Sequence, residues 1–352
     1  MKMNTLNYIG CKHTLFNSIL SVCQENIADM TNKTFMDLFA GTGTVGFNMT
    51  NYFKITNAND LEYYSYVINY ALLKCNYTEK IQNIIDICNG LKTLDEGLVY
   101  NNFTLNPDCE RMFFTNENAK KTDSIRQYIQ RLFEFEEITQ SEFYFLLASL
   151  LVSIDKVANT SCVYGAYLKE FKKSAVKPVI LQPIHTKTEI NDENNVYNEL
   201  AESLVKLDNQ YYDVIYMDPP YNHRQYSANY SPLNYIALYD ESIVLTGKTA
   251  LIENYNKSDF CKKREVKQAF TNLIRDVRCN YIILSYNNEG LLDIEEIKKI
   301  LLSKGFVKLY KIKYTKFKAQ QKVDKKFVEE YIWVVDTTKT GNLIVEIEME
   351  LI

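Results

Sequence analysis

The chain has few of the residues that build metal centres and lacks the spacing that such centres use. Only three of its 352 residues are histidine, and none of the eight cysteines forms a CxxC pair. Zinc sites of the common kinds draw on closely spaced cysteines and histidines. The sequence therefore predicts no metal site, and it predicts cysteines that remain free thiols in a reducing cytoplasm.

Segments that would carry the chain into a membrane are also missing. Residues 1–20 have no apolar core behind a basic start, so we expect no signal peptide. The most apolar run, Phe143–Ile154, is too short to span a bilayer and favours a buried helix. Hydrophobic residues make up 46% and charged residues 24% of the chain, which is typical of a globular protein without membrane contact.

An overall excess of positive charge is absent, because the formal net charge is −4. Basic residues are instead concentrated in three segments, 169–177, 262–267 and 304–326. Segregated positive charge of this kind is compatible with nucleic-acid binding even in an acidic protein. Taken singly, each segment is more often a solvated face than a binding site.

Short apolar runs alternate with helical patterns at both ends of the chain. A strand at 33–39, a glycine turn, a strand at 53–60 and a helix at 63–75 predict the start of a parallel α/β sheet. Further buried strands are predicted at 211–220 and 280–288. Two long strands, 305–317 and 327–336, predict an antiparallel hairpin.

The middle of the chain does not continue this alternation. Its best patterns are helices at 122–135, with Thr122 and Asp123 suited to cap the first turn, and at 139–159. We therefore expect a catalytic α/β domain formed by residues 1–85 and 205–352. Residues 86–204 are expected to form a mostly helical insertion.

The stretch DLFAGTGTVG, residues 37–46, places glycines at 41, 43 and 46 directly after a predicted strand. This G-x-G-x-x-G spacing suits a nicotinamide dinucleotide, and it also suits a tight turn without ligand. Asp37 at the strand end would repel a pyrophosphate but fits the ammonium of an amino-acid moiety, and Asp60 at the next strand end fits a ribose. A cofactor with a ribose and an amino acid but no phosphate is S-adenosyl-L-methionine.

The stretch DPPY, residues 218–221, ends another buried strand. The prolines restrict the backbone around Asp218, and Tyr221 offers a flat face. Carboxylate, fixed carbonyls and aromatic plane together suit a flat heterocycle with an exocyclic amine, whose nitrogen needs careful orientation to attack a methyl group. The plainer interpretation is a proline-terminated strand followed by a surface tyrosine.

These motifs resemble the adenine-specific DNA methyltransferases of the Dam type, including their FokI-like branch. NYIGCK at 7–12 resembles the N-terminal motif of that family, with Cys11 in place of a second glycine. NDLE at 59–62 resembles its ribose motif. DPPYNHRQYSANY, SYNNEG at 285–290 and DKVANTSCVYGAYLK at 155–169 resemble longer signatures of the FokI-like branch, so the resemblance spans nearly the whole chain.

The resemblance implies a Rossmann-like, seven-stranded methyltransferase sheet with an antiparallel hairpin at one edge and target recognition in the insertion. It implies methyl transfer to N6 of a flipped-out adenine in double-stranded DNA, without a metal. Catalysis is then assigned to Asp218, Pro219, Pro220 and Tyr221. Cofactor contacts are assigned to Tyr8, Gly10, Lys12, Asp37, Phe39, Gly41, Gly43, Asp60, Leu61 and Asp218.

Contacts with DNA are predicted from the basic segments and from aromatic residues near the catalytic motif. Tyr286, Tyr314 or Phe317 would supply a second ring for the base, although ordinary packing explains each of them as well. Asn159, Thr160 and Tyr164 suit either a DNA-facing loop or a helix end with a turn. The predicted DNA-binding residues are Lys169, Lys172, Lys173, Arg224, Tyr286, Tyr314, Lys316, Phe317 and Lys318.

Several functions remain open from the sequence. An N4-cytosine or RNA amine methyltransferase would use a similar motif, although the cytosine enzymes more often carry serine before the prolines. A DNA-binding module without activity and a nicotinamide-dependent dehydrogenase are further alternatives. As a methyltransferase, the protein would be the modification half of a restriction–modification system or an orphan or phage enzyme. A cognate endonuclease would then act on the same DNA site without stable binding.

Overall fold

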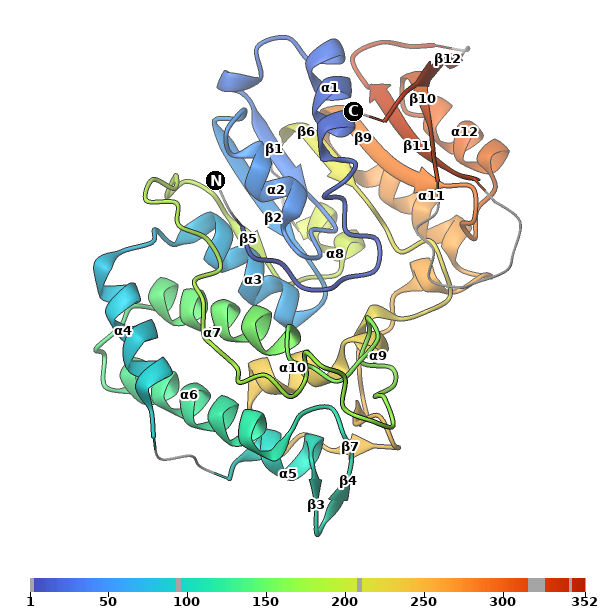
Figure 1. The fold of residues 1–352 in the computed structure, drawn as a ribbon. Coiled ribbons are helices and arrows are strands. Elements are labelled where there is room, and N and C mark those ends of the chain that lie inside the picture. The colour runs from blue at the N-terminus through green and yellow to red at the C-terminus, as the bar shows by residue number, and fades with distance from the viewer. Residues whose placement is uncertain (1–2, 93–95, 208–210, 316–326, 342–343, 352) are drawn as a thin grey trace.

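The core of the protein is one large twisted sheet (Figure 1). A computed structural model describes residues 3–92, 96–207, 211–315, 327–341 and 344–351, with the backbone alone at 313–315 and 327–328. Within these ranges the sheet has eight strands in the order β12-β10-β11-β9-β6-β1-β2-β5. The strands are β1 (Thr34–Asp37), β2 (Ile55–Asn59), β5 (Val196–Tyr197), β6 (Tyr212–Met217), β9 (Cys279–Asn287), β10 (Phe306–Thr315), β11 (Phe327–Asp336) and β12 (Ile344–Met349).

Strand direction confirms the predicted mostly parallel sheet and the predicted hairpin, and it corrects the strand number. β11 runs antiparallel to both β9 and β10, whereas the other neighbours in the sheet are parallel. The expectation of seven strands is wrong, because β12 pairs with the outer side of β10. The hairpin therefore lies one strand inside the edge of the sheet.

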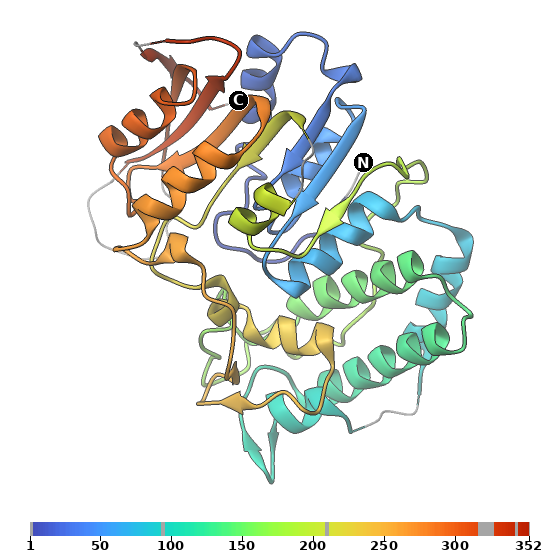
Figure 2. The ribbon, with the colours of Figure 1, turned by 180° about the vertical axis from the view of Figure 1, so that it is seen from behind.

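Helices cover both faces of the sheet, as the view from behind in Figure 2 shows for one of them. Alternate residues of a strand point to opposite faces. In β9, Ile283 belongs to the apolar cluster under α1 and α2, whereas Ile282 and Leu284 belong to the cluster under α8, α11 and α12. The bounds are α1 (Phe16–Asn26), α2 (Thr44–Met49), α8 (Ala201–Leu207), α11 (Val266–Asp276) and α12 (Ile294–Leu302).

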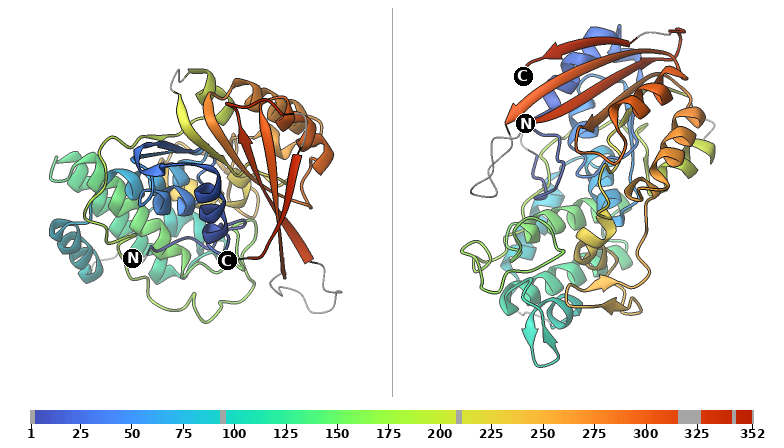
Figure 3. Two further views of the ribbon diagram at one scale, coloured as in Figure 1. Left: turned by 90° about the horizontal axis from the view of Figure 1, so that it is seen from above. Right: turned by 90° about the vertical axis from the view of Figure 1, so that its right-hand side faces the viewer.

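A mostly helical region packs below this sheet against α3 (Figure 3). Its elements come from the middle of the chain and from residues 226–252, and one apolar cluster joins them to α3. Helix α3 is Tyr63–Lys74. The elements of the helical region are α4 (Glu79–Gly90), α5 (Leu98–Phe103), α6 (Asn116–Glu134), α7 (Gln140–Asp155), α9 (Tyr226–Asn229), α10 (Ser231–Leu238) and the short strands β3 (Leu105–Asn106), β4 (Cys109–Glu110), β7 (Leu245–Thr246) and β8 (Leu251–Ile252).

The two predicted helices of this region exist, but the predicted start of the first is wrong. Helix α6 begins at Asn116, and Thr115 caps it by accepting the Asn118 N–H. Asp123 is buried inside the helix and accepts backbone N–H groups at the start of α5, including that of Val99 at 2.8 Å. Helix α7 begins as predicted, with a capping box between Thr139 and Glu142.

The predicted insertion of residues 86–204 contains β5, which belongs to the main sheet. The division into two domains stays a prediction. Within the described ranges, no helix combines the length and the apolar character that crossing a bilayer requires. All eight cysteines are free thiols.

Candidate active site

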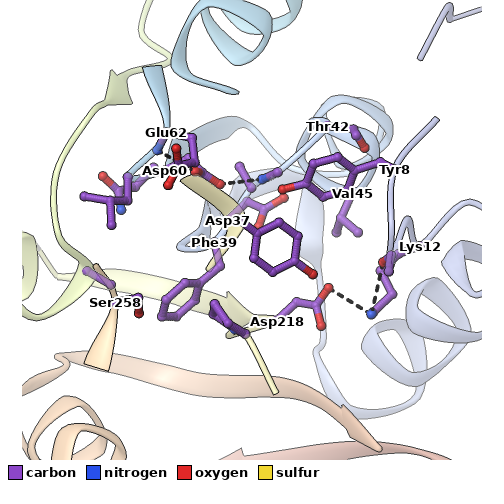
Figure 4. Close-up of a pocket in the computed structure, with 18 of the residues that line it drawn as sticks. Tyr8, Lys12, Asp37, Phe39, Thr42, Val45, Asp60, Glu62, Asp218 and Ser258 are labelled. Atoms are coloured by element: carbon purple, nitrogen blue, oxygen red, sulfur yellow. Dashed lines mark hydrogen bonds and ion pairs between the residues drawn. The ribbon is translucent and has the colours of Figure 1, made fainter. Parts of the chain in front are cut away.

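The candidate site lies where the carboxyl ends of β1, β2 and β6 meet. Strand β2 lies on one side of β1 and β6 on the other, so the chain reverses its direction across the sheet at this point. Ligands of open α/β sheets bind in the crevice at such a switch point. Asp37 ends β1, Asp60 follows β2 and Asp218 follows β6, so three carboxylates meet at this edge (Figure 4).

The glycine turn after β1 is built as the motif requires. Gly41 and Gly43 have φ angles of 51° and 74°, which favour glycine. A Cβ on Gly43 would lie 2.4 Å from Leu72, and one on Gly41 would lie 3.3 Å from the ring of Tyr8. Gly43 shapes the turn and the start of α2, whereas Gly41 lines the cavity.

Asp37 lines the cavity, and one of its carboxylate oxygens has no hydrogen-bond partner among the described residues. Its Oδ2 accepts the Gly46 N–H at 3.0 Å, which ties the strand end to α2. Its Oδ1 is buried and has no hydrogen-bond partner in the described part of the chain. Burial raises the pKa of Asp37 to about 8; the Gly46 N–H lowers it, and the carboxylates of Asp218 and Asp60 raise it further.

Both carboxylate oxygens of Asp60 accept hydrogen bonds from backbone N–H groups nearby. Its Oδ2 accepts the Gly41 N–H at 2.7 Å and its Oδ1 accepts the Glu62 N–H at 2.9 Å. Burial raises the pKa of Asp60, and these N–H groups act against that shift. Asp60 therefore fixes the glycine turn and also lines the cavity.

The buried Lys12 and the half-buried Asp218 form an ion pair. Lys12 Nζ lies 2.9 Å from Asp218 Oδ2 and donates to the Gly10 carbonyl at 3.2 Å. Burial alone would lower the pKa of Lys12, but the carboxylates of Asp218 and Glu330 reverse the shift and keep the lysine protonated. Burial raises the pKa of Asp218, and Lys12 opposes this. Oδ1 of Asp218 is buried and has no partner within the described ranges.

Pro220 and Tyr221 continue from Asp218 along two adjoining hollows. Pro220 lines the main cavity, whereas Pro219 is buried beside it. Tyr221 lines a second hollow together with Lys12 and Glu330. The ring of Tyr221 meets the ring of Tyr286 edge-on, with centroids 6.3 Å apart. A planar group that reaches Asp218 would therefore lie between the two hollows.

A group of stacked tyrosines lies beside the glycine turn. The Tyr8 ring stacks on Tyr230 with centroids 4.7 Å apart and on Tyr226 at 5.4 Å. The hydroxyl oxygen of Tyr230 accepts the Ile9 N–H at 2.9 Å. The segment after the catalytic motif thus holds the N-terminal segment that carries Lys12.

The main cavity encloses about 880 Å³ of empty space, its open mouth included, which is within the range of cofactor pockets. Acidic side chains, a buried lysine, a glycine turn and aromatic rings surround it. The predicted cofactor residues that line it are Tyr8, Gly10, Lys12, Asp37, Phe39, Gly41, Asp60, Leu61 and Asp218, so that only Gly43 of the predicted set does not.

The predicted DNA-binding residues differ in their exposure to solvent. Lys169, Lys173 and Arg224 are exposed, whereas the Lys172 ammonium donates to the Thr160 carbonyl at 2.6 Å. Tyr286 is 2% exposed and its hydroxyl accepts the Leu292 N–H, so it supports Tyr221 from below. The Tyr314 side chain and residues Lys316, Phe317 and Lys318 lie outside the described residues.

The sequence left two interpretations of the loop after α7: a DNA-facing loop, or a helix end with a turn. The contacts of Asn159 and Tyr164 agree with the second. Asn159 is buried and its amide donates to the carbonyls of Met112 and Leu168. Tyr164 is buried too, and its hydroxyl donates to Asp155 at 3.0 Å. These residues hold the loop that presents Lys169 and Lys173.

Four acids of the site were not predicted. The main cavity is lined by Glu62, Glu199 and Glu202, and the hollow beside Tyr221 is lined by Glu330. Glu62 lies two residues after Asp60 in the sequence. This proximity is the only local pattern that points to Glu62 as a site residue. Glu330 comes from β11, far along the chain, and its pairing with Asn287 of β9 brings it to Lys12.

Comparison with known proteins identifies relatives over almost the whole chain. Residues 8–326 match the family model described as D12 class N6 adenine-specific DNA methyltransferase. The type II methyltransferase M.NlaIII of Neisseria lactamica is 43% identical over 325 residues, which cover 90% of this chain and 93% of that protein. The type II methyltransferase M.CviAII of Paramecium bursaria Chlorella virus 1 is 39% identical, with coverages of 95% and 99%. The type II methyltransferase M.FokI of Planomicrobium okeanokoites is 37% identical over 94% of this chain and 52% of its own length.

Proposed function

Because the chain belongs to the D12 class of N6 adenine-specific DNA methyltransferases, we propose that its main cavity binds S-adenosyl-L-methionine. We further propose that Asp218 receives an adenine that has left the DNA duplex. One observation carries this proposal. Two buried carboxylate oxygens, Oδ1 of Asp37 and Oδ1 of Asp218, lack hydrogen-bond partners within the described ranges and border one cavity. Buried polar atoms of this kind normally have a partner.

The residues of the cavity fit the cofactor. The free oxygen of Asp37 can accept from an ammonium, and the glycine turn leaves room beside Tyr8. Asp60 and Leu61 border the ribose side, and Phe39 lines the same cavity. When bound, the cofactor supplies a methyl group on a positively charged sulfur.

Asp218 has the free oxygen that an amine needs. Its Oδ2 is held by Lys12, so its Oδ1 is left to accept a hydrogen from the adenine amine. This orients the nitrogen lone pair, and the proton becomes acidic only as the N–C bond forms. The hollow beside Tyr221 offers a stacking face for the base. Positioning in a partly closed site then supplies most of the rate.

DNA would approach over the mouth of the cavity. Lys169, Lys173 and Arg224 are exposed cations suited to phosphate contacts. Lys172 is better interpreted as a support for the loop, because its ammonium is bound to Thr160. The relatives named above are type II methyltransferases, so we also propose that an endonuclease acts on the same DNA site.

The proposal is tested by methyl transfer from tritiated cofactor to unmethylated duplex DNA. Wild-type protein should label N6-methyladenine, and Asp218→Asn should reduce the rate by about 10²- to 10³-fold while cofactor affinity changes little. Asn keeps the size of the side chain, so the variant keeps a partner for Lys12. The exposed Asp240→Ala serves as the control. Label in cytosine or RNA, or full activity of Asp218→Asn, would contradict the proposal.

A further inference from the structure

Glu62 is a buried acid that joins the cofactor cavity to the segment after the catalytic motif. It is the residue before α3 and is 4% exposed. Its Oε1 lies within hydrogen-bonding distance of the Ser227 hydroxyl in α9, and its Oε2 lies 2.7 Å from the Asn234 amide nitrogen in α10. None of the steps above uses this carboxyl group.

The orientation of Asn234 is fixed by the backbone. The Tyr64 N–H can only donate, and it donates to Oδ1 of Asn234 at 3.0 Å. The amide nitrogen of Asn234 must therefore face Glu62 and donate to its Oε2. Oε2 of Glu62 is then an acceptor, and a proton on this carboxyl group would have to be on Oε1.

The hydrogen count at Ser227 decides whether that proton is present. The hydroxyl oxygen of Ser227 contacts Oε1 of Glu62 and also the Asn256 carbonyl, at 2.7 Å. A serine hydroxyl has one hydrogen, and a carbonyl can only accept. If Ser227 donates to Asn256, the hydrogen between Ser227 and Glu62 must come from Glu62. With an ionised Glu62, one of the two buried contacts would join two oxygens without a hydrogen.

We propose that Glu62 is a neutral carboxylic acid that donates from Oε1 to Ser227, and that it is a positioning residue for the cofactor cavity. The inference rests on the proposed function, because the cavity it orders is the one assigned to S-adenosyl-L-methionine. The chain of hydrogen bonds from Glu62 through Ser227 to Asn256 holds the segment 253–258, whose Ser258 lines that cavity.

The surroundings of Glu62 favour the neutral form. Burial raises the pKa of Glu62 to about 7, and the neighbouring Asp60 carboxylate raises it further, against the Ser227 and Asn234 hydrogen bonds. The other titratable groups that face it are Tyr64 of α3 and Cys261 at the end of the 3₁₀ turn Asp259–Cys261. Neither supplies a positive charge.

Loss of the proton would disconnect the segment 253–258. Ser227 would then have to donate its hydrogen to the Glu62 carboxylate. The Asn256 carbonyl would lose its hydrogen bond from Ser227. Two hydrogen bonds, at 2.8 and 3.0 Å, join Gln225 to Ser258. They would lose the support that the Ser227–Asn256 hydrogen bond gives to this segment. The contribution of neutral Glu62 to cofactor affinity should therefore be lost as the pH rises through the pKa of Glu62.

Glu62→Gln provides the matched variant. A glutamine amide can donate to Ser227 and accept from Asn234, so it reproduces the neutral acid but does not titrate. S-adenosylhomocysteine binding is measured by calorimetry for both proteins from about pH 6 to about pH 8. Asp37 titrates in this range in both proteins, so the ratio of the two affinities removes its contribution. One pH unit above the midpoint, the affinity of wild type relative to that of Glu62→Gln should be about tenfold lower than it is at low pH.

A constant ratio across this range would overturn the inference. Infrared difference spectra between wild type and Glu62→Gln at the lower pH give a second, independent result, because a protonated carboxyl has a C=O stretching band that a carboxylate lacks. The band should be present in wild type and absent from the variant; its absence from wild type overturns the inference. If wild type binds no S-adenosylhomocysteine at any pH, the proposed function fails, and the infrared band still decides the state of Glu62.

Discussion

Asp37 and Asp60 both follow strands at one edge of the sheet, but their carboxylates have different surroundings. Both oxygens of Asp60 accept backbone N–H groups, whereas Oδ1 of Asp37 has no partner among the described residues. With a pKa of about 8, Asp37 carries a proton in most molecules at neutral pH. An ammonium group that binds there would displace this proton, because it stabilises the carboxylate.

In Glu62→Gln, whose residue 62 does not titrate, we therefore expect cofactor binding near pH 7 to release close to one proton per molecule bound, on the order of 0.9. Calorimetry in buffers with different ionisation enthalpies measures this number. Asp37→Asn combined with Glu62→Gln should release almost none. If that double variant binds too weakly, the dissociation constant of Glu62→Gln should fall as the pH rises toward about 8. Equal heats in all buffers would show that the ammonium does not meet Asp37.

Lys12 gives a second prediction at this scale. Its ammonium opposes the rise in the pKa of Asp218 that burial causes. Lys12→Met keeps the bulk of the side chain but removes the charge, so the pKa of Asp218 should rise further. Since the amine needs an ionised acceptor, the acidic limb of the kcat/KM profile should move to higher pH. Lys12→Arg keeps the charge, and its profile should stay near that of wild type. A limb that stays in place in Lys12→Met would contradict this.

The residues that the sequence predicted share one property. Asp37, Asp60 and Asp218 each follow an apolar run, and the carboxyl ends of parallel strands meet at one edge. Strand order alone therefore brings them together. Glu330 and Ser227 reach the site by strand register and by helix packing, which no local pattern records.

At the scale of elements, the end of β9 supports the catalytic motif. Tyr286 lies beneath Tyr221, and Gly290 follows so closely that an added Cβ would lie 2.1 Å from the Tyr286 ring. Gly290→Ala should push that ring toward Tyr221 and disturb the stacking face. We expect methyl transfer to fall by roughly 10- to 100-fold, with cofactor affinity unchanged.

Gly90→Ala is the matched control, because nothing lies within 4 Å of the added Cβ at the end of α4. Both variants are compared by single-turnover rates and by S-adenosylhomocysteine affinity. Equal rates in the two variants would show that the support of Tyr221 by Tyr286 does not matter for the reaction. A loss of affinity in Gly290→Ala would place its effect in the cofactor cavity.

Element types were predictable where the apolar pattern is long, and boundaries were not. The β10–β11 hairpin and helix α7 were predicted because each has a continuous apolar pattern. Asp123 looked like a cap for its own helix but caps α5, which only tertiary packing reveals. The short edge strands β5 and β12 gave no comparable signal, and β12 changed the strand number from seven to eight.

At the scale of the whole molecule, the N-terminal segment joins the sheet to the helical region. Asp155 at the end of α7 accepts the Asn7 backbone N–H at 2.7 Å and its side-chain amide at 2.9 Å. Five residues later, Lys12 contacts Asp218. Buried acids thus recur where segments meet, and burial raises the pKa of Asp37 to about 8, of Glu62 to about 7 and of Asp155 to about 6.

These shifts predict how stability depends on pH. An acid with a raised pKa in the folded state retains a proton that the unfolded chain has released, so its contribution to stability is lost as the pH rises toward the folded pKa. His185, whose pKa burial lowers to about 4, acts in the opposite direction, but only below its unfolded value of about 6.5. Above that value Asp37 and Glu62 dominate.

The free energy of unfolding should therefore fall by about 2 kcal/mol between about pH 6.5 and about pH 8, since each titrating group contributes about 1.4 kcal/mol per pH unit. Urea unfolding at several pH values measures this. Asp37→Asn should remove most of the slope and Glu62→Gln the part below about pH 7, because neither amide titrates. A saturating cofactor should remove the Asp37 part of the slope, since its ammonium keeps Asp37 ionised in the folded state as it is in the unfolded chain. Stability that rises with pH in the free protein would mean that these acids are ionised when folded.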